Sequence, residues 1–590
     1  MKLLALTLSL SFLTHSALAQ DAVAPIAASA LVASSITENS LKLAWKDNSA
    51  NETGFELKIT QGTSTPVLIN LGANVISFSA TGLKASTVYT YSLRSYVMKK
   101  SNKLFSGAVS ISPKTLATPV VVPPPVVVVT PPVVVVPPAP SPVSVLKAFP
   151  TAEGFGAKAV GGRGGKLFIV SSLADSGAGT LRECVSALGA RTCVFSVSGT
   201  ILLDTALAIK NPNITIAGQT SPGGIQLRNR NNLQSPLLID SNEVIVRHLR
   251  IRPGPSVQTS DLVDAITISS RDKGAAKVII DHVSMSWATD ELIQTGPAAT
   301  DITVQWSMVY EGLSRSTHVS GEHSKGPFLK GNRTTLHMNY VANNTRRVPN
   351  VSSASNVHQI DLVNNVFYNA REAFGEFYDE HGKININMVG NLFQMGPESF
   401  TNLNGAYAAY DYANSGKYGF ALYLKDNLDP NRRGLATEAE NLVLPASSRV
   451  YVVPQPVGQG LTSSAYPAKQ AALDVMAYAG SNLPVRDAQD MRVVREFFTC
   501  QGSVIDDPNE VGGWPAMLSA NAPLDSDKDG MSDAWEDLNG FNKLSALDMN
   551  LDKDSDGYTN LEEYLNHLAG DNVSVIGKGM GTLPAHRCGR

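Results

Sequence analysis

Two acidic runs near the C-terminus have the residue types and spacing of calcium-binding loops. Each begins Asp-x-Asp-x-Asp-Gly, with oxygen donors at positions 1, 3, 5, 9 and 12, a glycine for the turn, and a carbonyl at position 7. The first loop contains Asp525, Asp527, Asp529, Met531, Asp533 and Glu536, and the second contains Asp552, Asp554, Asp556, Tyr558, Asn560 and Glu563. This strict spacing predicts two Ca2+ sites and argues against a disordered acidic tail.

The elements that precede these loops repeat along residues 146 to 400. Apolar runs recur at steps of roughly 24 to 34 residues, as expected for successive coils of a solenoid. They lie at 213–218, 243–251, 277–285, 301–309, 334–342, 358–367 and 383–393. Asn339, Asn365 and Asn391 are 26 residues apart, so we expect them to stack at one bend of neighbouring coils.

The crossover rule for parallel strands then favours a right-handed parallel β-helix and a mainly β fold. A doubly wound α/β fold is the rival, but it requires amphipathic helices between the strands, and the pattern offers none.

The regions that flank this repeat differ from it in composition. Residues 22–115 contain short alternating segments separated by turn residues, which indicates a small β-sandwich. They resemble a fibronectin type III module, with Trp45 and Tyr89 as core residues. Residues 116–145 are rich in proline and valine and predict an extended linker. Residues 520–570 resemble an EF-hand or dockerin pair and predict a small helical calcium-binding region, which either stabilises the chain or docks a partner.

Several motifs within 146–515 occur in the order found in polysaccharide lyase family 1, the pectate lyases. They are AEGFGAKAVGGRGG at 152–165, IAGQTSPGGI at 216–225, DAITIS at 264–269, IDHVSMSWATDE at 280–291, HSKG at 323–326, RRVPN at 346–350, RDAQDMR at 486–492 and EVGGWP at 510–515. The resemblance implies a lyase that cuts α-1,4-linked polygalacturonate by calcium-assisted β-elimination and releases 4,5-unsaturated oligogalacturonides.

The resemblance also implies roles for individual residues. Asp264 and Asp290 would hold a catalytic calcium ion, Arg347 would accept the C5 proton, and Lys325 would contact the substrate carboxylate. A third carboxylate of the family falls on Gln294, which leaves Glu291 or a carbonyl as a substitute ligand. A second arginine of the family falls on Ser352. The nearby candidates for substrate binding are Arg346 and His323.

Arginine is an unusual base, because its pKa exceeds about 12. If Arg347 takes this role, nearby cations must help it to lose its proton, which predicts an alkaline optimum. Alternatively, Arg347 only pairs with the uronate. Asp281 and His282 match a family pair for which a structural hydrogen-bond role is expected.

The composition excludes some partners and predicts a compartment. A formal net charge of -3 provides no basic surface for nucleic acid. Residues 1–19 have the pattern of a secretory signal, and no later apolar run is long enough to span a membrane, so we expect a secreted or periplasmic protein. In that compartment the four cysteines would form Cys184–Cys193 and Cys500–Cys588 disulfides.

Two other functions remain open at this point. A β-helix polysaccharide hydrolase would require a pair of carboxylates as acid and base, and no motif of that kind is found. A carbohydrate-binding protein that has lost catalysis is also compatible with Gln294 and Ser352.

Overall fold

The computed structural model describes residues 24 to 585 and Cys588, apart from 35, 38, 63–65, 82, 100–101, 117–145, 271–272, 355–356, 401–403 and 412–417. The expected signal peptide and all but the first residue of the expected linker therefore lie outside the described residues. The chain divides into two compact units, Met1–Ala139 and Pro140–Arg590.

The N-terminal unit is a β-sandwich of two antiparallel sheets. One sheet contains β1 (Ser29–Ser34), β2 (Leu41–Lys46) and β5 (Ser77–Ala80), and the other contains β4 (Val67–Gly72), β3 (Gly54–Gln61), β6 (Tyr89–Lys99), β7 (Asn102–Phe105) and β8 (Val109–Ile111). Trp45 and Tyr89 are buried between the sheets. The Tyr89 hydroxyl accepts a hydrogen bond of 2.8 Å from the backbone N–H of Lys84. Both aromatic residues therefore serve the core of this unit.

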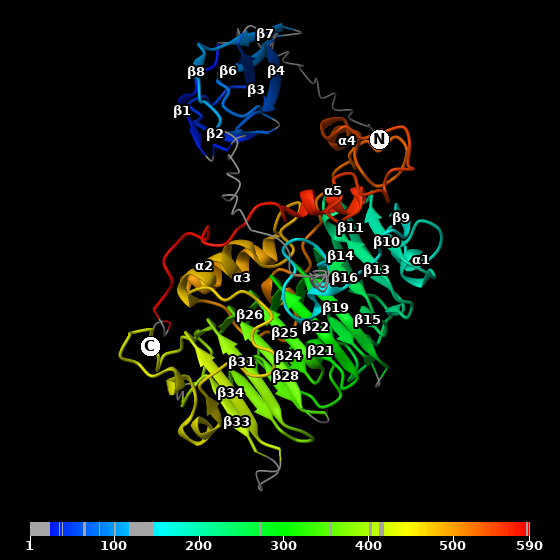
Figure 1. The fold of residues 1–590 in the computed structure, drawn as a ribbon, viewed down its shortest axis with the longest axis vertical. Coiled ribbons are helices and arrows are strands. Elements are labelled where there is room, and N and C mark those ends of the chain that lie inside the picture. The colour runs from blue at the N-terminus through cyan, green and yellow to red at the C-terminus, as the bar shows by residue number, and fades with distance from the viewer. Residues whose placement is uncertain are drawn as a thin grey trace, which may run out of the picture. The chain divides into compact units, whose positions relative to one another are not determined.

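The C-terminal unit is a parallel β-helix built from three sheets, named here sheets 1 to 3 (Figure 1). Sheet 1 contains β9 (Lys166–Val170), β10 (Arg191–Phe195), β13 (Ile214–Ala217), β16 (Val244–Arg247), β19 (Ala275–Asp281), β22 (Ala299–Gln305), β25 (Asn332–His337), β28 (His358–Val363), β31 (Ile384–Val389), β34 (Phe420–Lys425) and β35 (Val452–Val453). Sheet 2 contains β11 (Gly199–Leu203), β14 (Ile225–Asn229), β17 (Leu249–Ile251), β20 (Ser284–Ser286), β23 (Met308–Tyr310), β26 (Tyr340–Ala342), β29 (Val366–Tyr368) and β32 (Leu392–Gln394). Sheet 3 contains β12 (Leu207–Ile209), β15 (Leu237–Ile239), β18 (Ile266–Ile268), β21 (Glu291–Thr295), β24 (Lys325–Leu329), β27 (Asn350–Ser352), β30 (Gly375–Tyr378) and β33 (Tyr407–Tyr410).

The predicted mainly β, parallel β-helix fold is confirmed, and its register explains the sequence repeat. Val246, Ile280 and Val304 are partners in successive strands of sheet 1, and all three are buried. One apolar run per coil therefore forms a continuous column in the core.

The predicted asparagine stack is also present. The Oδ1 atom of Asn365 accepts hydrogen bonds from the backbone N–H and the Nδ2 of Asn339, both at 3.0 Å. Asn365 bonds Asn391 in the same way, and Asn391 bonds Asn427, so the stack is one residue longer than expected. Each buried side-chain amide therefore forms hydrogen bonds that join one coil to the next.

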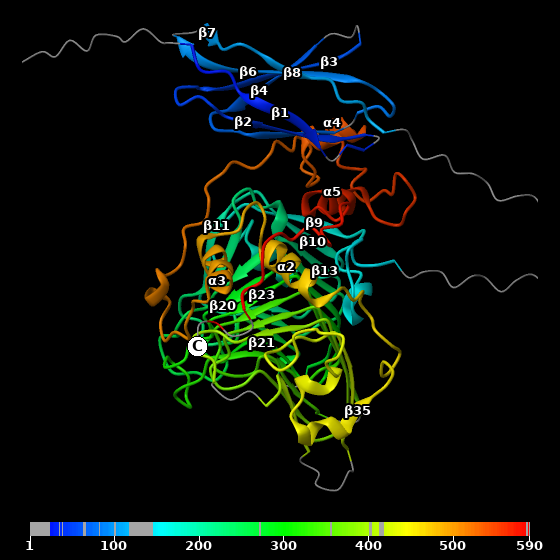
Figure 2. The same ribbon diagram turned by 90° about the vertical axis from the view of Figure 1, so that its left-hand side faces the viewer.

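Helices close one end of the β-helix and cover its side. Helix α1 (Leu181–Ser186) packs against β9, β10 and β12, at the first coil. Helices α2 (Ala468–Tyr478) and α3 (Ala488–Thr499) lie beside strands of sheet 2 (Figure 2). Their apolar residues, such as Val475 and Phe497, share a buried cluster with Tyr340 and Tyr368.

The expected calcium-binding region contains helices α4 (Asp533–Asn539) and α5 (Asn560–Ala569) and packs on sheet 1. Apolar side chains of this region meet Val194 and Ala217 in one buried cluster; they are Met531, Trp535, Leu561, Tyr564 and Leu565. Beyond α5, Asp571 forms a buried ion pair of 2.8 Å with Arg247 of β16. The region is thus part of the folded body of this unit.

Two disulfides link distant parts of the C-terminal unit. Cys184 of α1 bonds Cys193 of β10, with Cα atoms 6.0 Å apart. Cys500 bonds Cys588, with Cα atoms 5.1 Å apart, and fastens the chain end beside α3. Among the described residues, no helix has both the length and the apolar character to cross a membrane.

Candidate active site

The candidate residues of the central motifs gather along sheet 3, because neighbouring coils place them at equivalent positions. Asp264 lies just before β18, and Asp290 lies just before β21. Glu291 and Lys325 begin β21 and β24 and are register partners. A backbone bridge then joins Lys325 to Arg346, one coil further along. Residues more than 80 positions apart in sequence thereby line one face.

Three carboxylates meet at the centre of this face. Asp264, Asp290 and Glu291 each offer an oxygen atom, and these atoms lie within 4.8 Å of one another. Asp264 accepts hydrogen bonds from the Glu291 backbone N–H at 3.0 Å and from the Thr267 hydroxyl at 2.5 Å. Burial and the neighbouring Asp290 raise the pKa of Asp264 well above its usual value. Such a set of buried acidic oxygens suits a hard cation, and Ca2+ is of that type.

Arg347 approaches the carboxylates from the opposite side. Its guanidinium pairs with Glu291 and lies 4.2 Å from the centre of the Phe328 ring. The backbone of Arg347 adopts a positive φ of 58°, which is rare for a residue other than glycine and occurs often at functional sites. Burial lowers the pKa of Arg347 below its usual value. Among the arginines of this face, Arg347 is therefore the one that loses a proton more readily.

Arg346 is more exposed than Arg347, and its pKa moves in the other direction. It pairs with Glu376, and its Nη2 atom lies 3.5 Å from the Tyr378 hydroxyl. The hydrogen bond to Glu376 raises the pKa of Arg346. Arg346 is thus a permanent cation, suited to holding an anion rather than accepting a proton.

Lys325 stands between the two arginines and the carboxylates. Burial, followed by the charge of Arg346, lowers the pKa of Lys325. The next residue, Gly326, donates a hydrogen bond of 3.0 Å to the Arg346 carbonyl. A Cβ atom at Gly326 would lie 2.3 Å from the Arg347 carbonyl oxygen, so only glycine fits here. The glycine of the HSKG motif therefore allows β24 to approach the Arg347 backbone.

Two stacked histidines flank the carboxylate group. The Nε2 atom of His323 lies 2.8 Å from Asp290 Oδ1, and the ring of His318 stacks on that of His323 at 3.7 Å. His318 itself lies 3.6 Å from Asp290. Sequence reasoning selected His323 but missed His318 and Glu376, for which no motif or spacing gave a signal.

Two cavities extend along this face on either side of the charged group. The first, of about 470 Å³, is lined by Asp264, Asp290 and Gln294, among others, and includes Lys210 and Lys273. The second, of about 210 Å³, is lined by residues that include Lys325, Arg346, Arg347, Ser352 and Tyr378. Gln294 thus remains at the site as a neutral side chain, and the Ser352 hydroxyl donates to Glu380 at 2.8 Å. A chain-like ligand could lie across both cavities.

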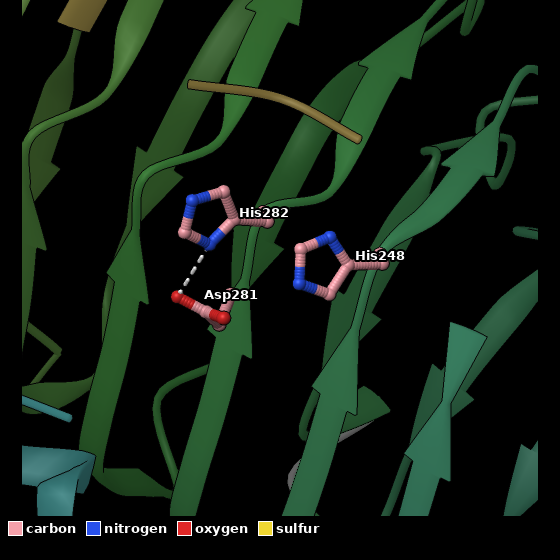
Figure 3. Close-up of side chains that lie close together, drawn as sticks. All are labelled: His248, Asp281 and His282. Carbon is pink, nitrogen blue, oxygen red and sulfur yellow. Dashed lines mark ion pairs between the residues drawn. The ribbon is translucent and has the colours of Figure 1, made fainter. Parts of the chain in front are cut away.

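The Asp281 and His282 pair belongs to sheet 1 and not to this face. Asp281 accepts hydrogen bonds of 2.8 Å from Arg247 and from Gln305, and lies 3.0 Å from His282 Nδ1. The rings of His248 and His282 stack at 4.9 Å (Figure 3). This cluster ties neighbouring coils together.

The first C-terminal loop brings several of its expected donors together, and both loops are curled by hydrogen bonds to their first aspartate. In the first loop, the two oxygens of Asp525 accept hydrogen bonds from Lys528 N and Gly530 N, at 2.8 and 3.0 Å, which curls the backbone. Asp525, Asp527 and Asp529 each offer an oxygen within 4.8 Å of the others. Burial and neighbouring carboxylates raise the pKa values of Asp529 and Glu536 to about 7, and that of Glu563 in the second loop to about 7.

The residues at position 9 make hydrogen bonds within their own loops. The carboxylate of Asp533 accepts hydrogen bonds from the backbone N–H and the hydroxyl of Ser526, at 2.7 and 2.8 Å. Asn560 accepts from Lys553 N at 3.1 Å in the second loop. Both side chains thereby close the loop onto its second residue.

Comparison with known proteins identifies relatives over most of the chain. A probable pectate lyase C from Aspergillus terreus is 34% identical over 440 residues, covering 72% of this chain and 95% of the relative. A probable pectate lyase C from Emericella nidulans is 32% identical over 446 residues, covering 74% and 96%. A pectate lyase from Nicotiana tabacum is 30% identical over 168 residues, covering 26% of this chain and 41% of the relative.

Among solved structures, the cedar pollen allergen Jun a 1 matches with a TM-score of 0.37 and 18% identity, covering 56% of this chain and 92% of the allergen. A two-domain fibronectin type III segment of chicken tenascin matches with a TM-score of 0.14 and 27% identity, covering 15% of this chain and 49% of the segment. No family model matches the sequence.

Proposed function

This chain belongs to the pectate lyase family and is a polysaccharide lyase, and from that premise we propose that it cleaves α-1,4-linked polygalacturonate by calcium-assisted β-elimination. The products would be 4,5-unsaturated oligogalacturonides. The observation that carries the proposal is the meeting of Arg347 and Lys325 with three carboxylates on one face of sheet 3.

Asp264, Asp290 and Glu291 would hold the catalytic calcium ion. When bound, calcium neutralises the uronate carboxylate and thereby makes the adjacent C5 proton more acidic. Glu291 stands in for the carboxylate that the family has at the position of Gln294. Because Glu291 also pairs with Arg347, it couples the proposed ion site to the proposed base.

Arg347 would accept the C5 proton, and Lys325 would hold the substrate carboxylate. Arg347 fits this role better than Arg346, because burial lowers the pKa of Arg347 whereas Glu376 raises that of Arg346. Arg346 and His323 would contact the uronates on either side. His323 would also orient Asp290, which its Nε2 atom meets at 2.8 Å.

A hydrolase remains the alternative reaction on a β-helix. Retaining and inverting hydrolases hold their two carboxyl groups about 5 Å or more apart, so that one can act as an acid and the other as a base or nucleophile. Asp264, Asp290 and Glu291 instead form a group of three, each offering an oxygen within 4.8 Å of the others. This close grouping favours cation binding.

The test is to incubate the full chain with polygalacturonate and calcium while recording the ultraviolet absorbance of the unsaturated product. We expect absorbance to grow, and Arg347→Ala to lower the rate by about 10²- to 10⁴-fold, as for removal of a general base. Arg433→Ala, at an exposed arginine that lines neither cavity of sheet 3, is the matched control. New reducing ends without absorbance would show a hydrolase, and neither signal would show a binding protein.

We further propose that the protein is exported, since two disulfides suit an oxidising compartment. The N-terminal sandwich would be a fibronectin type III-like spacer. For the calcium-binding region we favour a stabilising role over a docking role. Leu561, Tyr564 and Leu565 of α5 already pack on the enzyme's own β-helix, so a partner could not use that face.

A further inference from the structure

The first C-terminal loop contains an excess of buried acidic oxygens. Asp529 and Glu536 are fully buried. The oxygens Asp527 Oδ2, Asp529 Oδ2 and both carboxylate oxygens of Glu536 have no hydrogen-bond donor. Leaving charged groups buried without a partner costs several kcal/mol each. These oxygens therefore form a buried acidic group that lacks a compensating donor, as a cation site would.

A residue outside the loop completes this group. Asp548 lies between α4 and the second loop, and its Oδ1 atom is also buried without a donor. Asp529, Glu536 and Asp548 each offer an oxygen within 4.8 Å of the others. Both oxygens of Asp533, which the loop pattern assigns to the site, accept hydrogen bonds from Ser526, and neither is among the buried oxygens without a donor.

We propose that Asp548 is a ligand of the first calcium site and that Asp533 is not. The ligands would then be Asp525, Asp527, Asp529, the Met531 carbonyl, Glu536 and Asp548. This is an all-oxygen set of the size that Ca2+ takes, rich in the carboxylates that this ion prefers. The proposal rests on calcium binding by the C-terminal loops and is independent of the lyase reaction on sheet 3.

Backbone hydrogen bonds at Asp548 and its neighbour link the first loop to the second. The Asp548 carbonyl accepts a hydrogen bond of 2.7 Å from Asn560 Nδ2, at the start of α5. The next residue, Met549, accepts 3.0 Å from Leu561 N. One ion at the first site therefore holds loop one, α4 and the start of α5 together.

This connection reaches the β-helix. Glu562 of α5 pairs with Arg163 at 2.9 Å, and Asp571 beyond α5 pairs with Arg247. On the other side of the site, Gly530 faces the Leu167 side chain of β9. Calcium in the first site should consequently stabilise the docking of the whole region on sheet 1.

The experiment compares Asp548→Asn with Asp533→Ala in the full chain. Both carry Asp264→Asn and Asp290→Asn, so that the proposed catalytic ion does not contribute. Calorimetric titration with CaCl2 after chelator treatment gives the affinity, and thermal unfolding with and without calcium gives the stabilisation. A ligand that binds only the folded state raises the Tm in proportion to its affinity.

We expect Asp548→Asn to weaken the tightest calcium site at least tenfold and to shrink the calcium-induced rise in Tm. The same variant should keep or raise the Tm without calcium, since it removes one buried unpaired charge. Asp533→Ala should lower the Tm equally with and without calcium and keep the affinity within about twofold, because its role is to close the loop.

The reverse pattern would overturn the proposal: full affinity in Asp548→Asn, or a tenfold loss in Asp533→Ala. The proposal is also overturned if Asp548→Asn alone fails to fold without calcium. Removing an unpaired buried charge should not destabilise the calcium-free protein, so such a failure would give Asp548 another structural role. Lyase activity in the chain with intact Asp264 and Asp290 is measured separately. Failure of that activity with an unchanged calcium pattern would refute the function proposed for sheet 3 and leave this site standing.

Discussion

Gly326→Ala gives the sharpest test of whether the Arg347 position limits the reaction. The added Cβ would lie 2.3 Å from the Arg347 carbonyl oxygen and 3.3 Å from its carbonyl carbon, whereas ordinary contacts begin at 3.4 Å. The Arg347 backbone must therefore move by about 1 Å, and a displacement of that size can lower a rate by about 100-fold. That factor corresponds to about 2.7 kcal/mol in the activation free energy. The crowding should also cost about 1–3 kcal/mol of folding stability.

The assay measures kcat and KM on polygalacturonate at saturating calcium, with circular dichroism to show that the variant is folded. Gly274→Ala is the matched control, because a Cβ at this exposed glycine meets nothing within 4 Å and its φ is not positive. We expect kcat to fall about 100-fold in Gly326→Ala and to be unchanged in Gly274→Ala. A folded Gly326→Ala enzyme with full kcat would refute the reasoning that the Arg347 backbone position sets the rate.

Two further predictions concern the charge on Lys325 and the asparagine stack. Arg347 must be neutral to accept a proton, so activity should rise with pH to a maximum above neutrality. Lys325 must be charged, and burial lowers its pKa, so activity should fall again at higher pH as Lys325 loses its proton. Lys325→Arg should move the falling limb of the pH–rate profile to higher pH, since arginine keeps its charge, and an unmoved limb would assign that limb to another group. Asn365→Ala removes four side-chain hydrogen bonds, to Asn339 twice, Leu336 and Asn391, and at about 1 kcal/mol each should lower the free energy of unfolding by about 4 kcal/mol in urea titrations. A loss below about 1 kcal/mol would mean that water replaces the amide.

The fold was predictable from the sequence because a β-helix repeats one local pattern. Each coil contributes one apolar run, and the spacing of Asn339, Asn365 and Asn391 marks a bend at which the coils have equal length. The stack continues to Asn427 after a step of 36 residues, and the sequence analysis missed it because a longer loop interrupts the spacing there.

The contacts of the candidate site were much less predictable. Motifs brought attention to Glu291 and Arg347, but their pairing depends on the stacking of coils separated by loops of unequal length. His318 lies in such a loop, and its stacking on His323 has no counterpart in residue spacing. The loop pattern at residues 525 to 536 predicts calcium ligands from their position alone. It contains no information on the hydrogen bonds that Asp533 accepts from Ser526. Which carboxylate oxygens of this loop lack a hydrogen-bond donor therefore depends on the local three-dimensional structure.

The disulfide-linked helix at the first coil bears on how this protein avoids self-association. A parallel β-helix has an open terminal coil, whose exposed backbone and core could pair with another molecule. Helix α1 covers that end, the Cys184–Cys193 bond fixes it to β10, and the buried Arg191 side chain binds the Cys184 and Val185 carbonyls at 2.8 and 2.9 Å. Reduction that allowed α1 to detach would expose the edge strand β9 as a template for end-to-end pairing, so this disulfide protects solubility as well as fold.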